Sequence, residues 1–325
     1  MKARSAIVQW MALAATALAT AAAAQSYPTK PIRMVVGFPP GGGTDVVARI
    51  IAPRLSESLG QPIVIDNRPG ATGTVAAGMV AKAPADGYTI MMGHVSVNAI
   101  APSLFAKLPY DVEKDFAPIT LTASVPHFIV VHPSLPVTSV KELIAYARTR
   151  DGKLSFPSAG NGSTPHLAGE MFKTMAGVNL LHVPYKGTGQ SMQDLLGGQH
   201  QVAFDTLPAC TPHVRTNRLR PLAVTSAKRL AEFPDVPTVE QAGVAGYQMT
   251  TWYGVFAPAG TPRPIVERLH GEISKTMQTP DTRARLLEAG ADDTVTRSPA
   301  EFTAIVRADI VRYAKIVKQA GVRID

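Results

Sequence analysis

The sequence predicts an α/β fold of two lobes joined by two crossing strands, and two observations indicate it. Short β-rich runs alternate with helical patterns along the chain, which is typical of parallel α/β construction. Two longer extended runs, 119–131 and 249–257, bracket the middle of the chain. If both runs cross between lobes, residues 25–125 plus 255–325 form one lobe and residues 126–254 the other. A continuous doubly wound sheet has the same local pattern and is the alternative.

The elements of the first lobe follow from apolar spacing and from the residues that end each run. Residues 32–38 read as a buried strand, and Val47, Ile50, Ile51 and Leu55 follow helical spacing up to Gly60, which ends that helix. We expect a strand at 63–65, a helix at 75–81 and a strand at 89–92.

The second lobe repeats the alternation. We expect helices at 140–147, 167–175 and 192–196, strands at 154–156, 181–183, 202–204 and 222–225, and a short helix after Pro237. The C-terminal part is predicted to be helical at 264–277, 282–289 and 300–320.

The N-terminus, residues 1–24, has the layout of a secretory signal peptide. Lys2 and Arg4 form a basic region, residues 6–24 are mostly apolar, and Ala22-Ala23-Ala24 offers a small-residue cleavage site. The alternative is a retained membrane anchor, but this Ala-dominated stretch is interrupted by three polar residues and makes a poor span. We therefore expect a soluble periplasmic protein without membrane insertion after cleavage.

Composition and charge narrow the function classes. The formal charge is +8, and its basic residues are scattered instead of forming a stripe interleaved with aromatics, so nucleic-acid binding is not expected. A mild positive field favours small anions. Cys210 is the only cysteine, so no internal disulfide can form.

A first candidate binding loop, 37–45, lies between the first strand and the first helix. Gly41-Gly42-Gly43 leaves backbone N–H groups open to close approach, where the helix dipole presents its positive end. No Lys follows Gly43, so the loop lacks the phosphate-contacting cation of a P-loop. The alternative is a tight turn with an ordinary cap from Thr44 or Asp45.

A second loop of this kind, 158–166, again follows a strand and precedes a helix. Ser158 and Ser163 add side-chain donors to the open N–H groups. Ligands of open α/β sheets bind at the carboxyl ends of strands, so two such loops, one in each lobe, predict a small anion held between them. Ser96 and Asp205 follow strands and share this rim. Asp205 either accepts a hydrogen bond from a ligand hydroxyl or amine, or ties down a neighbouring loop.

Catalytic motifs do not occur in the sequence. There is no G-x-S-x-G nucleophile elbow and no H-E-x-x-H, and the eight histidines show no spacing typical of metal ligands. No catalytic residue, metal ligand or cofactor is therefore assigned. His166 lies in the second loop, but no nucleophile accompanies it.

An ordered set of motifs resembles the solute receptors of tripartite tricarboxylate transporters, the Bug-type extracytoplasmic receptors. The similar segments are 38–45, Asn67-Arg68-Pro69-Gly70-Ala71, Leu108-Pro109-Tyr110-Asp111, 158–166, His182-Val183-Pro184-Tyr185-Lys186-Gly187, Pro234-Asp235-Val236-Pro237-Thr238, Trp252-Tyr253-Gly254 and Pro258-Ala259-Gly260-Thr261-Pro262. The resemblance covers essentially the whole chain after residue 24.

The resemblance implies a type II periplasmic-binding fold and a carboxylate held largely by backbone N–H groups and ordered water. By position it implies ligand contacts from Phe38, Gly42, Gly43, Thr44, Asp45, Ala71, Ser158, Gly160, Ser163 and His166, and more weakly from Asp205. Its implied partners are the membrane subunits of such a transporter. Two other hypotheses stay open: a ligand sensor for a two-component kinase, and a periplasmic enzyme acting on a carboxylate or ester.

Overall fold

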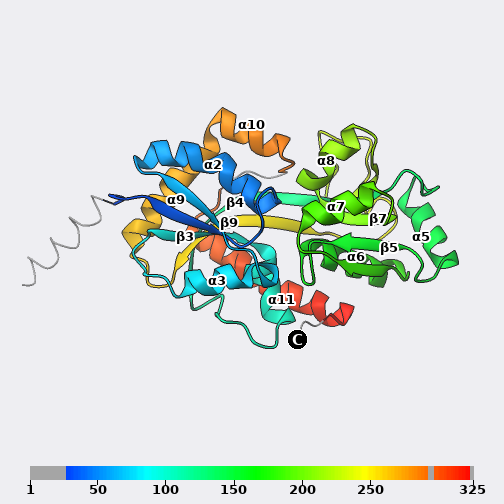
Figure 1. Ribbon diagram of the computed structural model, residues 1–325, viewed down its shortest axis with the longest axis horizontal. Coiled ribbons are helices and arrows are strands. Elements are labelled where there is room, and N and C mark those ends of the chain that lie inside the picture. The colour runs from blue at the N-terminus through cyan, green and yellow to red at the C-terminus, as the bar shows by residue number, and fades with distance from the viewer. Residues whose placement is uncertain (1–26, 292–295, 323–325) are drawn as a thin grey trace, which may run out of the picture.

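The computed structural model describes residues 27–291 and 296–322, which form two α/β lobes joined by two long strands (Figure 1). The expected signal peptide, residues 1–24, lies outside the described residues. The first lobe contains strands β1 (Ile32–Val36), β2 (Ile63–Asn67) and β3 (Thr89–His94). The second contains β5 (Ser155–Ser158), β6 (Leu181–Pro184), β7 (Val202–Thr206) and β8 (Arg220–Val224). The strands between them are β4 (Phe116–Val131) and β9 (Thr250–Pro258).

The crossing strands change partners along their length. β4 pairs with β9 as far as Pro126 opposite Thr250, and from His127 onward it pairs with β7, with β8 also pairing from Phe128. β9 pairs with β3 on its other edge. The predicted fold, two lobes joined by two crossing strands, is therefore confirmed. The expected parallel pairing is found for β1–β2, β1–β3 and β5–β6. The pairs made by β4 and β9 are antiparallel. The chain leaves the first lobe along β4 and returns along β9.

Helices cover both lobes, and their starts and ends follow local sequence signals. The first lobe has α2 (Gly43–Leu59), η1 (Ala71–Gly73), α3 (Thr74–Ala81), η2 (Ser96–Ile100), α4 (Ala101–Leu104), α9 (Arg263–Gln278) and α10 (Pro280–Glu288). The second has α5 (Val140–Thr149), α6 (Thr164–Ala176), α7 (Thr188–Leu196) and α8 (Leu207–Arg215). α2 buries Val47, Ile51 and Leu55 and ends where Gly60 adopts φ 67°. The last helix, α11 (Pro299–Ala320), starts with a capping box formed by Ser298 and Glu301.

Two local expectations differ from the structure. The short helix expected after Pro237 is wrong: this segment forms turns, in which Gly243 and Gly246 take φ values of 105° and 72° that a right-handed helix excludes. The segment after β3 is helical, as η2 and α4, although the sequence analysis expected no helix there. Its N-cap is Val95, and the N–H of Ser96 in the first turn donates to Nδ1 of His94, the residue before the N-cap. None of the usual N-cap residues, Ser, Thr, Asp or Asn, therefore marks this start in the sequence.

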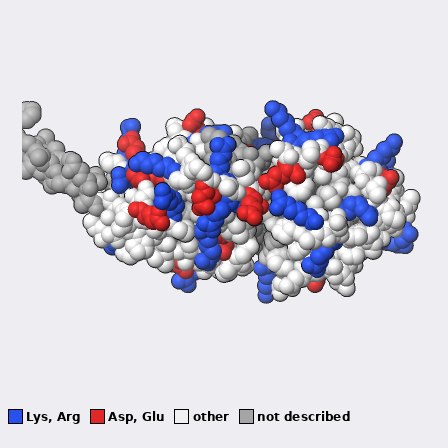
Figure 2. Space-filling model, turned by 90° about the horizontal axis from the view of Figure 1, so that it is seen from above, with Lys and Arg blue, Asp and Glu red and all other residues white. Residues whose placement is uncertain are grey.

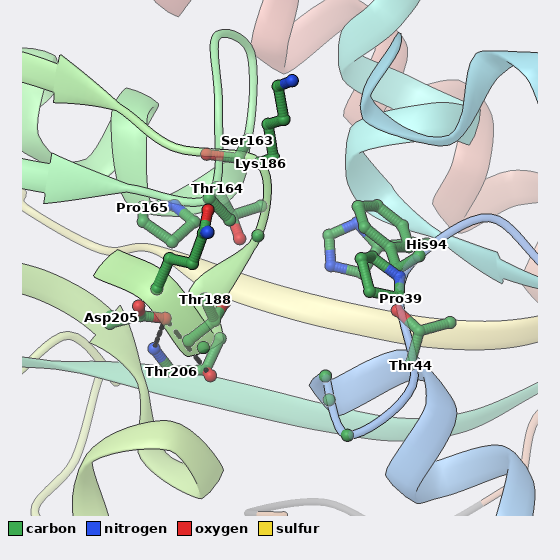
Figure 3. A pocket seen from close by; sticks show the side chains of 18 of the residues that line it. Pro39, Thr44, His94, Ser163, Thr164, Pro165, Lys186, Thr188, Asp205 and Thr206 are labelled. Carbon is green, nitrogen blue, oxygen red and sulfur yellow. Dashed lines mark hydrogen bonds between the residues drawn. The ribbon is translucent and has the colours of Figure 1, made fainter. Parts of the chain in front are cut away.

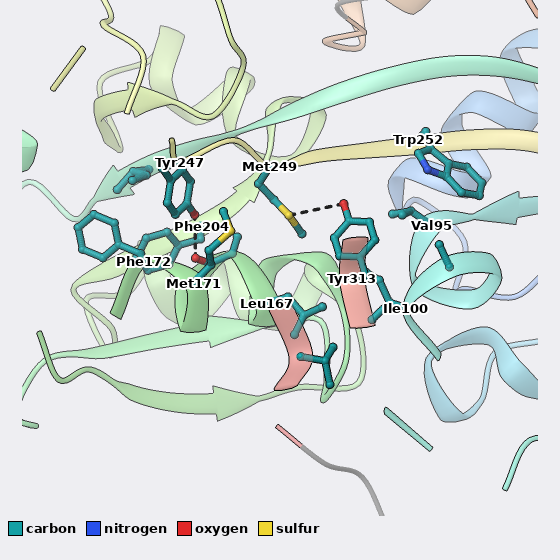
Figure 4. Packing of buried hydrophobic residues seen from close by; sticks show 14 of the residues in the cluster. Val95, Ile100, Leu167, Met171, Phe172, Phe204, Tyr247, Met249, Trp252 and Tyr313 are labelled. Carbon is teal, nitrogen blue, oxygen red and sulfur yellow. Dashed lines mark hydrogen bonds between the residues drawn. The ribbon is translucent and has the colours of Figure 1, made fainter. Parts of the chain in front are cut away.

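The two lobes share apolar packing along α11. This helix packs on η2, α4 and β4 and also on α6 of the second lobe. Figure 4 shows Tyr313 of α11 between Trp252 and Met249, and the Tyr313 hydroxyl donates to Thr250 O at 3.2 Å. One hydrophobic cluster thus reaches from Ile100 in the first lobe to Phe172 in the second.

The surface shows no separation of charge on the face seen in Figure 2, where Lys and Arg are interspersed with Asp and Glu. Within residues 27–291 and 296–322, no helix combines the length and apolar character that crossing a membrane requires.

Candidate ligand-binding cleft

A cavity of about 370 Å³ lies between the two lobes (Figure 3). The first lobe lines it with the loop that precedes α2 and with His94 at the end of β3, and the second with the loops that precede α6, α7 and α8. Tyr253 of the crossing strand β9 also lines it. The lining residues are Phe38, Pro39, Pro40, Gly41, Gly42, Gly43, Thr44, His94, Ala159, Ser163, Thr164, Pro165, Lys186, Gly187, Thr188, Gly189, Gln190, Asp205, Thr206 and Tyr253.

Four helices begin at this cleft, namely α2, α6, α7 and α8. Their N-cap residues are Gly42, Ser163, Gly187 and Thr206, and none of the four helices has a side-chain hydrogen bond at its cap. The first N–H groups of a helix have no partner within the helix, and the helix dipole adds partial positive charge there. The cleft therefore gathers backbone donors and positive potential from both lobes, which suits a small anion.

Asp45 holds the first loop from behind and does not line the cleft. Its Oδ2 accepts from Gly41 N at 2.9 Å and from Arg49 Nε at 2.8 Å, and its Oδ1 accepts from Asn67 Nδ2 at 2.9 Å. Burial alone would raise the pKa of Asp45, but the hydrogen bonds from Arg49, Gly41 and Asn67 outweigh it and lower that pKa. Asp45 is thus a fully bonded carboxylate that fixes the path of the glycine loop.

Gly43 meets a tyrosine at the floor of the cleft. A Cβ atom at Gly43 would overlap the Tyr253 hydroxyl and stand 3.2 Å from its Cζ. The tyrosine ring packs against His94 at 5.4 Å, and His94 packs against Phe38 at 4.9 Å between ring centroids. The absence of a side chain at Gly43 is therefore what lets the first turn of α2 lie against this aromatic group.

The second loop presents its backbone to the cleft and turns most of its polar side chains away. Ser158 Oγ pairs with His182 Nε2 at 2.7 Å, and the ring of His182 stacks on that of His166 at 3.8 Å. His166 Nδ1 accepts from Gly162 N at 3.0 Å. Burial, followed by the charges nearby, lowers the pKa of His166 to about 3 and that of His182 to about 4, so both rings are neutral at physiological pH.

The structure brings together six of the residues expected at the site and leaves six outside the lining. Those that line the cleft are Phe38, Gly42, Gly43, Thr44, Ser163 and Asp205; those that do not are Asp45, Ala71, Ser96, Ser158, Gly160 and His166. Gly160 O accepts from the hydroxyls of Ser158 and Ser163, at 3.1 and 2.7 Å. Ala71 is exposed beside Thr72, and Ser96 is buried with its hydroxyl unpartnered among the described residues.

Thr72 contacts the opposite lobe directly. Its Oγ1 donates to Asn161 O at 2.8 Å, and this bond joins the loop before α3 to the loop before α6. A second close approach across the cleft is that of Gly187 to Pro39, whose Cγ would lie 3.5 Å from a Cβ at Gly187. The described conformation is therefore one in which the two lobes touch.

Three parts of the cleft were not predicted from the sequence: the start of α7 at residues 186–190, His94 and Tyr253. Lys186 is the only Lys or Arg among the residues that line the cleft, and in Figure 3 its side chain extends away from Asp205. Gly187, a glycine between a strand and a helix, was the available signal. No comparable signal marked Tyr253, because a residue inside a strand shows its direction only once the strand is paired. No group of three or more His, Cys, Asp or Glu able to hold a metal occurs in the described parts of the chain.

Two α/β lobes, two crossing strands and a donor-rich cleft between them define a solute-binding receptor of the periplasmic binding type. The chain belongs to the tripartite tricarboxylate transporter receptor family, whose model matches residues 47–322. It is 38% identical to a protein of Pseudomonas sp. strain P51, over 97% of this chain and 94% of that one. It is 36% identical to BugT of Bordetella pertussis, over 96% of each chain.

Solved structures agree with this assignment. A Rhodopseudomonas palustris protein in a structure with adipate is 43% identical, with a TM-score of 0.88, covering 91% of this chain and 99% of that one. MatC from the same organism, with bound malate, is 34% identical, with a TM-score of 0.83, covering 90% and 100% of the two chains. The periplasmic binding protein BugD is 36% identical, with a TM-score of 0.84, covering 91% and 99%. The family and the fold inferred from the sequence motifs are thereby confirmed.

Proposed function

We propose that this receptor captures a small carboxylate in the periplasm and delivers it to the membrane subunits of a tripartite tricarboxylate-type transporter. The observation that supports this most directly is the convergence of four helix N-termini without side-chain caps on one cleft. A carboxylate can accept two or three backbone N–H bonds there, each worth about 1.5–3 kcal/mol because the acceptor is charged. Adipate and malate in two relatives are ligands of this class.

The site residues divide into two roles under this proposal. Phe38, Gly42, Gly43, Thr44, Ser163 and Asp205 contact the ligand, since they line the cleft. Asp45, Ser158, Gly160 and His166 hold the two loops in shape through their hydrogen bonds. Ala71 and Ser96 are the first residues of the short helices η1 and η2 and act on the ligand only through those helices.

We propose that the mature chain starts near residue 25 and is a soluble two-lobed molecule. The first lobe is residues 25–125 plus 255–325, and the second is residues 126–254. The change of partner on β4 after Pro126 and the start of β9 at Thr250 support these boundaries. The receptor binds its ligand and releases it unchanged, which recovery of the ligand by mass spectrometry after prolonged incubation tests.

A thermal-shift screen of the protein against a panel of carboxylates tests the function. A ligand at about 100 times its Kd adds roughly 2.7 kcal/mol of stability, a rise of several degrees that the screen resolves. We expect at least one di- or monocarboxylate to produce it, with adipate and malate as the first probes. The proposal is wrong if no carboxylate shifts the melting temperature while inorganic sulfate or phosphate does. Capture of membrane subunits that depends on the same ligand tests delivery.

A further inference from the structure

Asp205 is a buried carboxyl group that lines an otherwise donor-rich cleft. It is 4% exposed and lies near the end of β7, next to Thr206, the N-cap of α8. Its Oδ1 accepts from Thr206 N at 2.7 Å and from Thr206 Oγ1 at 3.5 Å, the two bonds drawn in Figure 3. Its Oδ2 has no hydrogen-bond partner among the described residues. One oxygen is thus satisfied and the other is left for whatever fills the cleft.

No cation contacts Asp205 in the described structure. Lys186 extends toward the other end of the cleft (Figure 3). Tyr253 also lines the cleft, its hydroxyl has no hydrogen-bond partner among the described residues, and its pKa is raised by burial and then by the charge of Asp205. Burial raises the pKa of Asp205 to about 7, although the bonds from Thr206 favour the charged form. An ionised Asp205 would also repel the anion that the four helix N-termini attract.

Burial shifts the pKa values of His94, His127 and Cys210, which lie around Asp205, away from neutral pH. Burial lowers the pKa of His94 to about 3 and that of His127 to about 4, and it raises the pKa of the Cys210 thiol. The charged and titratable groups on the elements packed around Asp205 are His127 (β4), Tyr253 (β9), His94 (β3), Cys210, His213 and Arg215 (α8), His166, Glu170 and Lys173 (α6), Lys186 (before α7), Asp194 (α7), and Asp45, Arg49, Arg54 and Glu57 (α2).

We propose that Asp205 meets the ligand as a neutral carboxylic acid and donates its proton to the bound carboxylate, so that capturing one anion takes up one proton. This inference rests on the proposed function. Oδ2–H of Asp205 becomes the donor, a ligand carboxylate oxygen becomes the acceptor, and the Tyr253 hydroxyl lies beside them. The proton comes from solvent, because the free cleft holds Asp205 partly ionised near neutral pH. A receptor of this kind prefers ligands that place a carboxylate, and not an ammonium group, beside Asp205.

The sign of the pH dependence follows from the raised pKa. Affinity is highest where Asp205 is already protonated and falls as the pH rises through its pKa, because the proton must then be taken from solvent. With a free-state pKa of about 7 and a protonated complex, affinity falls about tenfold between pH 6 and pH 8. A ligand that offered an ammonium group to Asp205 would give the opposite trend.

Isothermal titration of the full chain with adipate and with malate, at pH 6, 7 and 8, tests the inference. Titrations at pH 8 in two buffers of different ionisation enthalpy should show close to one proton taken up per ligand. Asp205→Asn keeps the shape and a donor but cannot ionise, so its ratio of affinities at pH 6 and pH 8 should fall to about one. The ligand's own ionisation is the same in both experiments, so the difference between the wild-type and Asp205→Asn affinity ratios reports on Asp205 alone. Asp235→Asn, on an exposed loop outside the cleft, removes the same charge and should keep the tenfold ratio.

Three outcomes overturn the inference. They are wild-type binding with no proton uptake, an Asp205→Asn protein that keeps the pH dependence, and a folded Asp205→Asn protein that no longer binds at any pH. The last would mean that the ligand needs an ionised acceptor. If Asp205→Asn fails to fold, the number of protons that the wild-type protein takes up per ligand still tests the inference. Absence of any carboxylate binding between pH 6 and 8 would instead defeat the proposed function, and is distinguishable from binding without proton uptake.

Discussion

Gly43→Ala is the substitution whose effect the structure specifies most closely. The added Cβ would overlap the Tyr253 hydroxyl and lie 3.2 Å from Cζ. Tyr253 is 1% exposed and its ring is held against His94, so the ring cannot turn aside without disturbing its neighbours. The loop before α2, in which Pro40 and Gly41 are exposed, is tied to Asp45 by one hydrogen bond at Gly41 N, so it moves more readily than the buried ring. We therefore expect the loop to shift and the cleft to lose its donor geometry.

The expected loss of ligand affinity in Gly43→Ala has two contributions. Overfilling a packed site costs about 1–3 kcal/mol, and each misaligned hydrogen bond to a charged acceptor loses up to about 1.5–3 kcal/mol. Since about 1.4 kcal/mol corresponds to a tenfold change in Kd, affinity for the carboxylate should fall by about 10- to 100-fold. Most of the effect should appear in binding, because the loop can relax into solvent.

Titration calorimetry and thermal unfolding of three variants separate these effects. Gly42→Ala is the matched change one residue earlier: its Cβ would meet nothing closer than Pro39 O at 3.5 Å, so its loss should be clearly smaller. Tyr253→Phe combined with Gly43→Ala removes the overlapping hydroxyl and should recover part of the lost affinity. If Gly43→Ala binds like the wild type, or if Tyr253→Phe recovers nothing, the overlap is not what makes glycine necessary at this position.

Two further predictions concern closure and capture. Thr72→Ala removes the hydrogen bond to Asn161 O that joins the lobes and should weaken binding about 2- to 10-fold, which corresponds to about 0.5–1.5 kcal/mol. Thr72→Ser keeps the hydroxyl and should keep most of the affinity. Equal losses of affinity for the two variants in calorimetry would contradict this prediction. Lys186→Gln should slow ligand association several-fold at low ionic strength and hardly at all in high salt, because an exposed cation at the cleft steers anions. Arg68→Ala, whose guanidinium pairs with Asp66 outside the cleft, is the stopped-flow control and should associate at the wild-type rate.

The sequence predicted the elements wherever apolar periodicity coincided with a stop signal. α2 is the clearest case, since Val47, Ile51 and Leu55 share one face and Gly60 ends the helix. The prediction of secondary structure failed where contacts between distant segments determine the local conformation. The segment after Pro237 was read as helix, but its Val239 N–H bonds to Val224 O of β8. After one helical bond, from Ala242 N to Thr238 O, the chain takes positive φ values at Gly243 and Gly246 that end the turn. The helix after β3 begins at Val95 without a side-chain cap, and its Ser96 N–H bonds to the His94 imidazole, a contact that no common sequence pattern indicates.

The sequence predicted which loops form the candidate site, but it predicted much less well which side chains of those loops face the cleft. Glycine and serine before a helix mark a loop whose N–H groups are open, and this signal located the starts of α2 and α6 correctly in the fold. The direction of a side chain within such a loop depends on the turn that the chain makes. Thr44 and Asp45 are adjacent, yet Thr44 lines the cleft and Asp45 faces backward to Arg49 and Asn67.

This division has a consequence for specificity. Backbone N–H groups and helix dipoles recognise any carboxylate of suitable size, so the four helix N-termini provide affinity for the class and little choice within it. Choice among carboxylates must come from the side chains that reach the cleft with unused polar atoms. Asp205, Tyr253, Thr44 and His94 are buried residues of the cleft that each keep a polar side-chain atom without a partner among the described residues. Exchanging them should change which carboxylate binds, whereas changes at the helix N-termini should weaken all carboxylates together, and a ligand panel run on both sets of variants distinguishes the two patterns.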